Sequence, residues 1–134
     1  GAPQEQAVEV PVVDPEPLTV GLPPCRAADG HATTIESVAP TTEGRLSLRV
    51  TYRGGCTAHE FRLCWPERSF VDATPPRASL ELLHTGPEDS CDAMWFDELE
   101  LDVRPMAEAW RAAYPDRSGE LVLQLGDHST IYRF

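Results

Sequence analysis

Apolar and polar residues alternate over most of the chain from residue 32 onward. Successive side chains of a β-strand point to opposite faces, so this alternation indicates strands with one buried and one solvated face. The predicted strands are 32–38, 46–52, 59–65, 77–84, 98–103, 120–126 and 129–134. About seven strands of this kind are typical of antiparallel sheets packed on a common core.

One segment departs from this pattern. Met106, Trp110 and Ala113 follow helical spacing, Pro105 suits a first helical turn, and Pro115 ends the helix. We therefore expect one crossover helix at about 105–114. The combination predicts a mainly β fold, an antiparallel immunoglobulin-like β-sandwich, with a closed barrel as the alternative. The cysteine–tryptophan–cysteine pattern of a true antibody domain, with its order and spacing, is absent.

The first 24 residues hold six of the 13 prolines. Proline lacks a backbone donor and fixes φ, which disfavours helices and central strands. We expect residues 1–24 to form an extended arm or linker, and residues 25–134 to form a single β-sandwich domain.

Charge excludes several classes of partner. The chain has 22 acidic and 11 basic residues, which gives a net charge of −11, and every basic residue is arginine. Such a surface repels phosphates, so we expect neither nucleic acid nor an anionic membrane surface as a partner. No apolar run approaches the roughly 18 residues of a membrane span. The absence of lysine excludes Schiff-base chemistry.

The four cysteines allow three disulfide connectivities, and no C-x-x-C pair is present. Cys64 has the opposite strand parity from Leu63, so it points away from the core and suits a bridge to Cys25, at the end of the arm. Cys56 and Cys91 both fall in connections between predicted strands. We therefore predict the pairs Cys25–Cys64 and Cys56–Cys91, an arrangement that suits an oxidising compartment.

The alternative for the same residues is a soft-metal site. Cys56, His59 and Cys91 offer two thiolates and an imidazole, a donor set suited to copper or zinc, which His31 or His84 could complete. A Cys-x-x-His spacing is common by chance, and a histidine entering a strand is more often structural. The disulfide interpretation is preferred, with no cofactor.

Other candidate sites are weak. The acidic residues between 88 and 102 lack the order of a calcium loop, and the alternating acids at 98–102 are better explained as a solvated strand face. No G-x-S-x-G elbow or legible nucleophile–base pair is present, so we expect no enzyme. Trp95 and Phe96 place rings on opposite faces of a strand. We expect a buried edge there; an exposed ring would mark a contact surface.

The stretch from Val50 to Trp65, VTYRGGCTAHEFRLCW, contains G-G-C-x-x-H-x-F-x-L-x-W and resembles the C-terminal β-sandwich domain of NigD-like bacterial lipoproteins. Uncharacterised myxobacterial-type lipoproteins are also similar in the Phe70–His84 strand, the Asp89–Ala93 loop and the helix PMAEAWRAAY, so that the resemblance covers about 100 residues. The chain departs from the longer NigD-like proteins in having a proline-rich arm in place of their small N-terminal barrel. The resemblance implies an extracytoplasmic sandwich, with a lipid anchor upstream of residue 1 as an option, and no particular chemistry.

These observations lead to one functional expectation and one alternative. We expect a non-enzymatic, lipoprotein-like β-sandwich that binds or supports an unknown protein or envelope partner. We expect it in the periplasm or on the cell surface, tethered to the outer membrane. The alternative is a copper- or zinc-binding protein that uses Cys56, His59 and Cys91.

Overall fold

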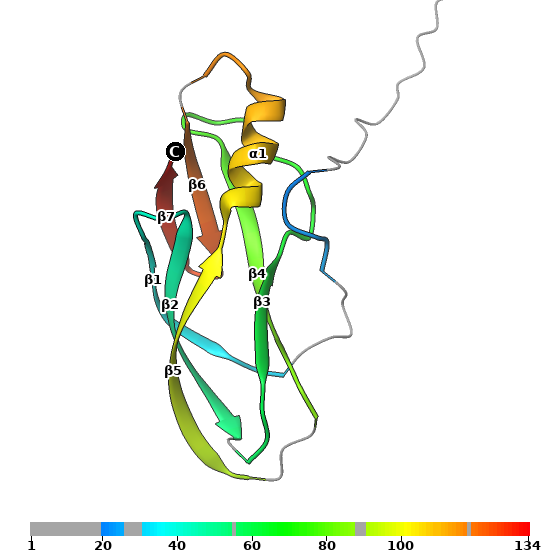
Figure 1. Ribbon diagram of the computed structural model, residues 1–134, viewed down its shortest axis with the longest axis vertical. Helices are drawn as coiled ribbons and strands as arrows, with labels where there is room; N and C mark the ends of the chain where they lie inside the picture. Colours follow the sequence, from blue (N-terminus) through cyan, green and yellow to red (C-terminus); the bar gives the residue numbers. More distant parts are fainter. Residues whose placement is uncertain (1–19, 26–30, 55, 88–90, 118) are drawn as a thin grey trace, which may run out of the picture.

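Seven strands and one helix make up the computed structural model over residues 20–25, 31–54, 56–87, 91–117 and 119–134, the part of the chain that it describes (Figure 1). The elements are β1 (Thr34–Pro40), β2 (Arg45–Gly54), β3 (Glu60–Cys64), β4 (Arg77–Thr85), β5 (Ala93–Asp102), α1 (Arg104–Ala113), β6 (Glu120–Leu125) and β7 (His128–Arg133). β1, β2 and β5 form one sheet in that order, and β3, β4, β6 and β7 form the other. The predicted β-sandwich is confirmed.

Consecutive strands repeatedly change sheets. The turn after Gly54, whose φ is +135°, leads from β2 in the first sheet to β3 in the second. After β4 the chain passes to β5 in the first sheet, and α1 then connects β5 to β6 in the second sheet. The two strands on either side of Cys56 are therefore not hydrogen-bonded neighbours but lie in opposite layers.

One strand pair differs from the antiparallel expectation. β4 and β6 run parallel, with Arg77 opposite Val122 and Leu80 opposite Leu125, whereas the other ladders are antiparallel. A parallel pair needs a long crossover. Here β5 and α1 together supply it, because β5 carries the chain back to the end at which β4 began (Figure 1).

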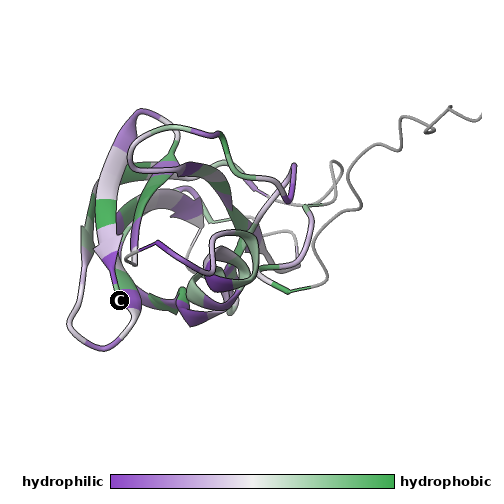
Figure 2. Cartoon of the chain, turned by 90° about the horizontal axis from the view of Figure 1, so that it is seen from above, coloured by the Kyte–Doolittle hydropathy of each residue, from purple (hydrophilic) through white to green (hydrophobic). Residues whose placement is uncertain are grey.

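The helix closes one end of the sandwich, the end from which Figure 2 views the molecule. Its buried side chains, Met106, Ala107, Ala109 and Trp110, recur at helical spacing and pack into the same core cluster as the strands. Val103 is the N-cap and Pro105 lies in the first turn, where its missing N–H costs no helical hydrogen bond.

Alternation along β2 assigns the two faces of the first sheet. Leu46, Leu48 and Val50 are buried in the core, while Arg45 and Arg49 lie on the outer face. The antiparallel register places each outward arginine beside a glutamate of β5: Arg49 lies directly opposite Glu98 at 3.9 Å, and Arg45 lies diagonally from Glu100 at 3.9 Å. These exposed pairs contribute little stability individually.

The packed structure includes the segment that precedes the first strand. Leu22 is buried in the core cluster, and the backbone N–H of Trp65 donates a hydrogen bond of 2.7 Å to the Pro23 carbonyl. Of the predicted arm 1–24, positions 1–19 lie outside the described residues. No helix in the described part is long and apolar enough to cross a membrane.

Candidate functional site

The Cys56–Cys91 disulfide joins two connections between the sheets. Cys56 follows β2, and Cys91 precedes β5, the antiparallel partner of β2. The two Cα atoms are 5.7 Å apart, and the bridge spans 35 residues of sequence. It therefore ties the passage from β2 to β3 to the passage from β4 to β5, both at the end of the sandwich opposite α1 (Figure 1).

A cluster of three histidines lies at the same end of the sandwich. His84, near the end of β4, is only 1% exposed, and its ring centroid lies 4.6 Å from that of His59 and 5.2 Å from that of His31. Two aromatic rings line it, with Phe61 stacked on His84 at 4.5 Å and Tyr52 edge-on at 4.7 Å. His84 and Phe61 face each other across the β3–β4 ladder, which fixes this stacking.

Both ring nitrogens of His84 have hydrogen-bond partners. Nε2 lies 2.7 Å from Nδ1 of His59, and Nδ1 lies 2.9 Å from the Thr33 hydroxyl. His31 joins the cluster through its backbone, whose N–H donates to the His84 carbonyl at 2.7 Å, and through Nε2, which lies 2.9 Å from the Gly86 carbonyl oxygen. These contacts dock the 31–33 segment onto the end of β4.

The surroundings of His84 favour its neutral form. Burial lowers the pKa of His84 below 6.5, and the nearby rings of His59 and His31 lower it further by charge repulsion, against a hydrogen bond to Ala32 that raises it. A hydrogen bond between two imidazole nitrogens needs one donor and one acceptor. Protonating both His59 and His84 would put a hydrogen on each facing nitrogen and break the bond.

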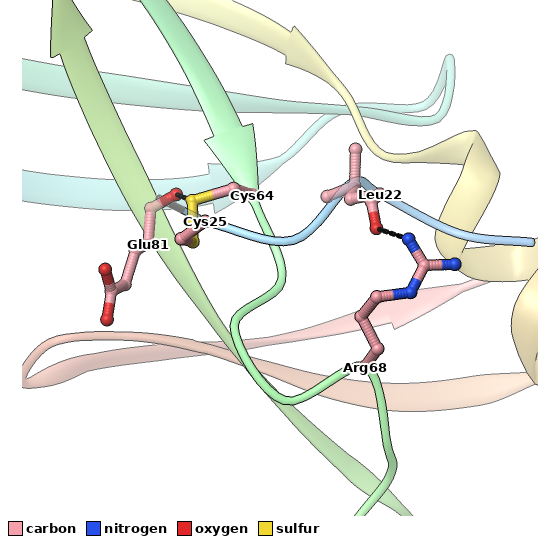
Figure 3. Close-up of a disulfide and its surroundings, with 5 residues drawn as sticks. All are labelled: Leu22, Cys25, Cys64, Arg68 and Glu81. Atoms are coloured by element: carbon pink, nitrogen blue, oxygen red, sulfur yellow. Dashed lines mark hydrogen bonds between the residues drawn. A yellow bond between two sulfur atoms is a disulfide. The ribbon is translucent and has the colours of Figure 1, made fainter. Parts of the chain in front are cut away.

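The second disulfide, Cys25–Cys64, fastens the Val20–Cys25 segment to the C-terminal end of β3 (Figure 3). Cys64 has the outward parity predicted for it, yet it is 1% exposed because this segment covers it. Arg68 supports the same segment by donating from its guanidinium to the Leu22 carbonyl at 3.0 Å and the Val20 carbonyl at 3.3 Å. Both predicted pairs are present, and none of the four cysteines is a free thiol.

The predicted metal ligands are not arranged as a metal site. Cys56 and Cys91 are oxidised in their bridge, so neither sulfur is a thiolate. Among the described residues, the only group of three or more whose potential ligand atoms all lie within 4.8 Å of one another is Cys25, Cys64 and Glu81, and these two sulfurs share a disulfide. Cys56, His59 and Cys91 do not meet that distance, and neither do the three clustered histidines.

The other notable surface is the first half of β5. Residues 93–98 are all exposed, including three large apolar side chains in a row: Met94 (54%), Trp95 (46%) and Phe96 (77%). Neighbouring strand residues point to opposite faces, so neither face of this half-strand is covered. The expectation of a buried edge at Trp95 and Phe96 is wrong, because both side chains are exposed.

A groove lies beside Phe96. It has a volume of about 620 Å³ and is lined by Glu36, Arg49, Val50, Phe96, Asp97 and Glu98. Glu36 sits at an irregularity in the β1–β2 register, where its carboxylate accepts a hydrogen bond of 3.2 Å from the Thr51 hydroxyl. The groove thus combines an exposed aromatic ring with carboxylates from two strands.

Sequence reasoning did not assemble the histidine cluster or identify this exposed stretch. For His84 a signal exists, because it has the same parity as the buried residues Ala78 and Leu80 on β4. For Trp95 and Phe96, three consecutive apolar residues interrupt the alternation and give no indication of facing.

No protein-family model, curated protein or solved structure matches this chain.

Proposed function

We propose that this protein is an extracytoplasmic, non-enzymatic β-sandwich that binds a protein partner in the cell envelope. The observation that carries the binding role is the exposed run Met94–Trp95–Phe96. Contiguous exposed apolar side chains are costly in water and mark contact surfaces, and aromatic residues are enriched in the cores of protein interfaces.

The location is supported by the cysteines. Two disulfides, with no cysteine left over, indicate an oxidising environment. The resemblance to NigD-like lipoproteins supports the finer assignment, the periplasm or a cell surface reached through a lipid anchor. The excess of 11 negative charges supports a protein partner rather than nucleic acid or anionic lipid.

Site-specific photo-cross-linking in the producing cell tests the binding role. A photoreactive amino acid placed in turn at Val71, Phe96 and Ile131 samples three exposed apolar positions in different parts of the fold. We expect a discrete protein adduct from at least one position and recovery of the chain in the envelope fraction with no thiol that alkylates before reduction. The absence of adducts at all three positions, or alkylatable thiols in the cell, would contradict the proposal.

The alternative function is soft-metal binding by Cys56, His59 and Cys91. It requires reduction of the Cys56–Cys91 bridge and release of His59 from its 2.7 Å hydrogen bond with His84. Copper and zinc stoichiometry measured on oxidised and reduced protein, with His59→Gln as the matched variant, separates the two functions. Stoichiometric metal in the reduced parent and its loss in His59→Gln would favour the metal.

A further inference from the structure

We propose that the unpaired edge of β5 captures an extended, basic segment of the partner protein as an added β-strand, with Trp95 and Phe96 as the apolar anchors. This inference rests on the proposed binding function and names the surface and the chemical class of its partner.

The first support is topological. β5 is the last strand of its sheet and pairs with β2 along all ten of its residues, from Ala93 to Asp102. Within the described part of the chain, its other side has no hydrogen-bonded strand. Every second residue of such an edge presents its N–H and C=O outward, which is the template that strand addition uses. At the other side of the sandwich, β1 and β7 approach each other, and His128 Nε2 lies 2.9 Å from the Ile35 carbonyl oxygen.

The second support is the side-chain pattern on that edge. Phe96 lies on the outer face beside the 620 Å³ groove, while Trp95 belongs to the opposite face and pairs across the ladder with Tyr52. An added strand presents its own side chains alternately to the two faces. It would therefore contact Phe96 with one set and Trp95 with the other, whereas the groove lies over β2, on the far side of Phe96 from the unpaired edge.

The third support is charge. β5 carries four acids, Asp97, Glu98, Glu100 and Asp102, and no base. Arg45 and Arg49 approach Glu100 and Glu98 only from the β2 side and only at 3.9 Å, and these side chains remain largely exposed. Asp102 is already held by Arg104, with contacts of 2.8–2.9 Å, so Asp97, Glu98 and Glu100 are the acids that keep capacity for cations on the unpaired side. An incoming strand that carries arginine or lysine meets opposite charges across the new ladder, which stabilises strand pairs.

The same charges argue against the two nearest competitors. A second copy pairing through β5 would bring four acids of each chain together, and like charges facing each other destabilise strand pairs. The chain's own residues 1–19 include Glu5, Glu9, Asp14 and Glu16 and contain no base. A basic segment from a different protein therefore fits the edge best.

Peptide titration of the full, oxidised chain tests the proposal. The probe is a capped peptide as long as β5 in which arginine alternates with valine. One control replaces each arginine with glutamate, and a second keeps the arginine sequence but carries backbone N-methyl groups at alternate residues, which removes strand pairing while retaining charge. Binding is followed by calorimetry and by the Trp95 indole resonance in NMR, at low and at physiological salt.

We expect the arginine peptide to bind, the glutamate peptide to show no binding, and N-methylation to weaken binding at least about tenfold. Phe96→Ala should weaken binding by a similar factor, because truncated aromatic anchors dominate interfaces. The control Val71→Ala, which removes another exposed apolar side chain outside β5 (54% exposed, against 77% for Phe96), should leave affinity unchanged. Unchanged denaturant midpoints check that both variants fold.

The proposal would be overturned if the N-methylated peptide bound as tightly as the unmethylated one, or if Phe96→Ala bound the arginine peptide as tightly as the parent protein does. Either result would mean that the interaction is unspecific charge attraction. Absence of arginine-peptide binding, or self-association that Phe96→Ala abolishes, would overturn it too. Cellular adducts from Val71 or Ile131 but not from Phe96 would overturn the proposed strand addition at β5. The broader proposal, that the protein binds a partner, would still stand.

Discussion

Nε2 of His84 lies 2.7 Å from Nδ1 of His59, so a buried imidazole on β4 is hydrogen-bonded to a less buried one that precedes β3. The pair accommodates one shared proton between its facing nitrogens. Its surroundings are aromatic rings, the Thr33 hydroxyl and His31, with no carboxylate among these contacts to stabilise a second charge.

This relationship predicts a loss of stability on mild acidification. Because the pKa of His84 in the folded state is below 6.5, the unfolded chain binds more protons as the pH falls through 6.5. The stabilising contribution of neutral His84 is present above pH 6.5 and declines as the pH drops toward the folded pKa. Urea midpoints between pH 7.5 and 5.5 should fall, and His128→Gln should retain this dependence.

NMR titration separates the causes of the His84 shift. Burial is the larger cause and repulsion by His59 the second. The pKa of His84 should therefore rise in His59→Gln, which removes the charge and keeps a hydrogen-bonding side chain, but stay below 6.5. A His84 that titrates at or above 6.5 in the parent would show that the cluster tolerates the charge.

A second prediction concerns the start of α1. Asp102 Oδ1 accepts hydrogen bonds of 2.9 Å from the Arg104 backbone N–H and Nε, and these contacts with Arg104 lower the pKa of Asp102 from 3.8 to about 2. A depressed carboxyl pKa stabilises the fold above pH 3.8, and this contribution is lost as the pH falls toward 2. Asp102→Asn should therefore flatten the decline of the urea midpoint between pH 4 and 2.

Asp97→Asn is the control for Asp102. Asp97 lies on the same strand and is exposed, and its side chain makes no hydrogen bond or ion pair with the described residues. This variant should decline with pH as the parent does. Identical profiles for all three proteins would mean that the Asp102–Arg104 contact does not persist in solution.

The facing of β3 gives a third prediction. Leu63 is 4% exposed and pairs with Leu82 across the ladder, whereas its neighbour Arg62 points to solvent. Leu63→Ala should lower the free energy of unfolding by about 2–5 kcal/mol through lost burial and a residual cavity. Arg62→Ala should change it by less than about 0.5 kcal/mol. Equal midpoints in denaturant would overturn the assigned facing.

Much of the fold follows from local pattern. Alternation predicted the core faces of β2 and β3, and helical spacing with Pro105 and Pro115 predicted α1 to within about a residue at each end. Alternation reports which side chains share a face but not which strands are neighbours. For that reason the sequence did not reveal that β2 and β3 lie in opposite sheets, or that β4 and β6 run parallel.

The candidate sites could be predicted from local sequence pattern less completely than the fold, because they depend more strongly on tertiary structure. Both disulfides could be predicted because parity and loop position restrict each cysteine locally. A strand at Trp95 and Phe96 was expected, but the exposure of both rings could not be predicted, because Met94, Trp95 and Phe96 carry no alternation. Their exposure depends on tertiary packing, which no local pattern encodes.

The last prediction separates the roles of the two bridges. They close loops of similar length, 39 residues for Cys25–Cys64 and 35 for Cys56–Cys91, so the chain-entropy model assigns each a similar stabilisation of roughly 4 kcal/mol. Their surroundings differ, because the first bridge also holds buried Leu22 against the core. We therefore expect Cys25→Ala/Cys64→Ala to be less stable than Cys56→Ala/Cys91→Ala, with both double variants still folded.

Urea unfolding of the two double variants, beside peptide mapping of the unreduced parent, provides the measurement. The parent should yield the linked peptides Cys25–Cys64 and Cys56–Cys91 and no alkylated thiol. Leu22→Ala should lower stability in the parent by more than it does in Cys25→Ala/Cys64→Ala, because part of the Leu22 contribution depends on the bridge that positions it. Equal effects in both backgrounds would show that Leu22 docks independently, through Arg68 and the Trp65–Pro23 hydrogen bond.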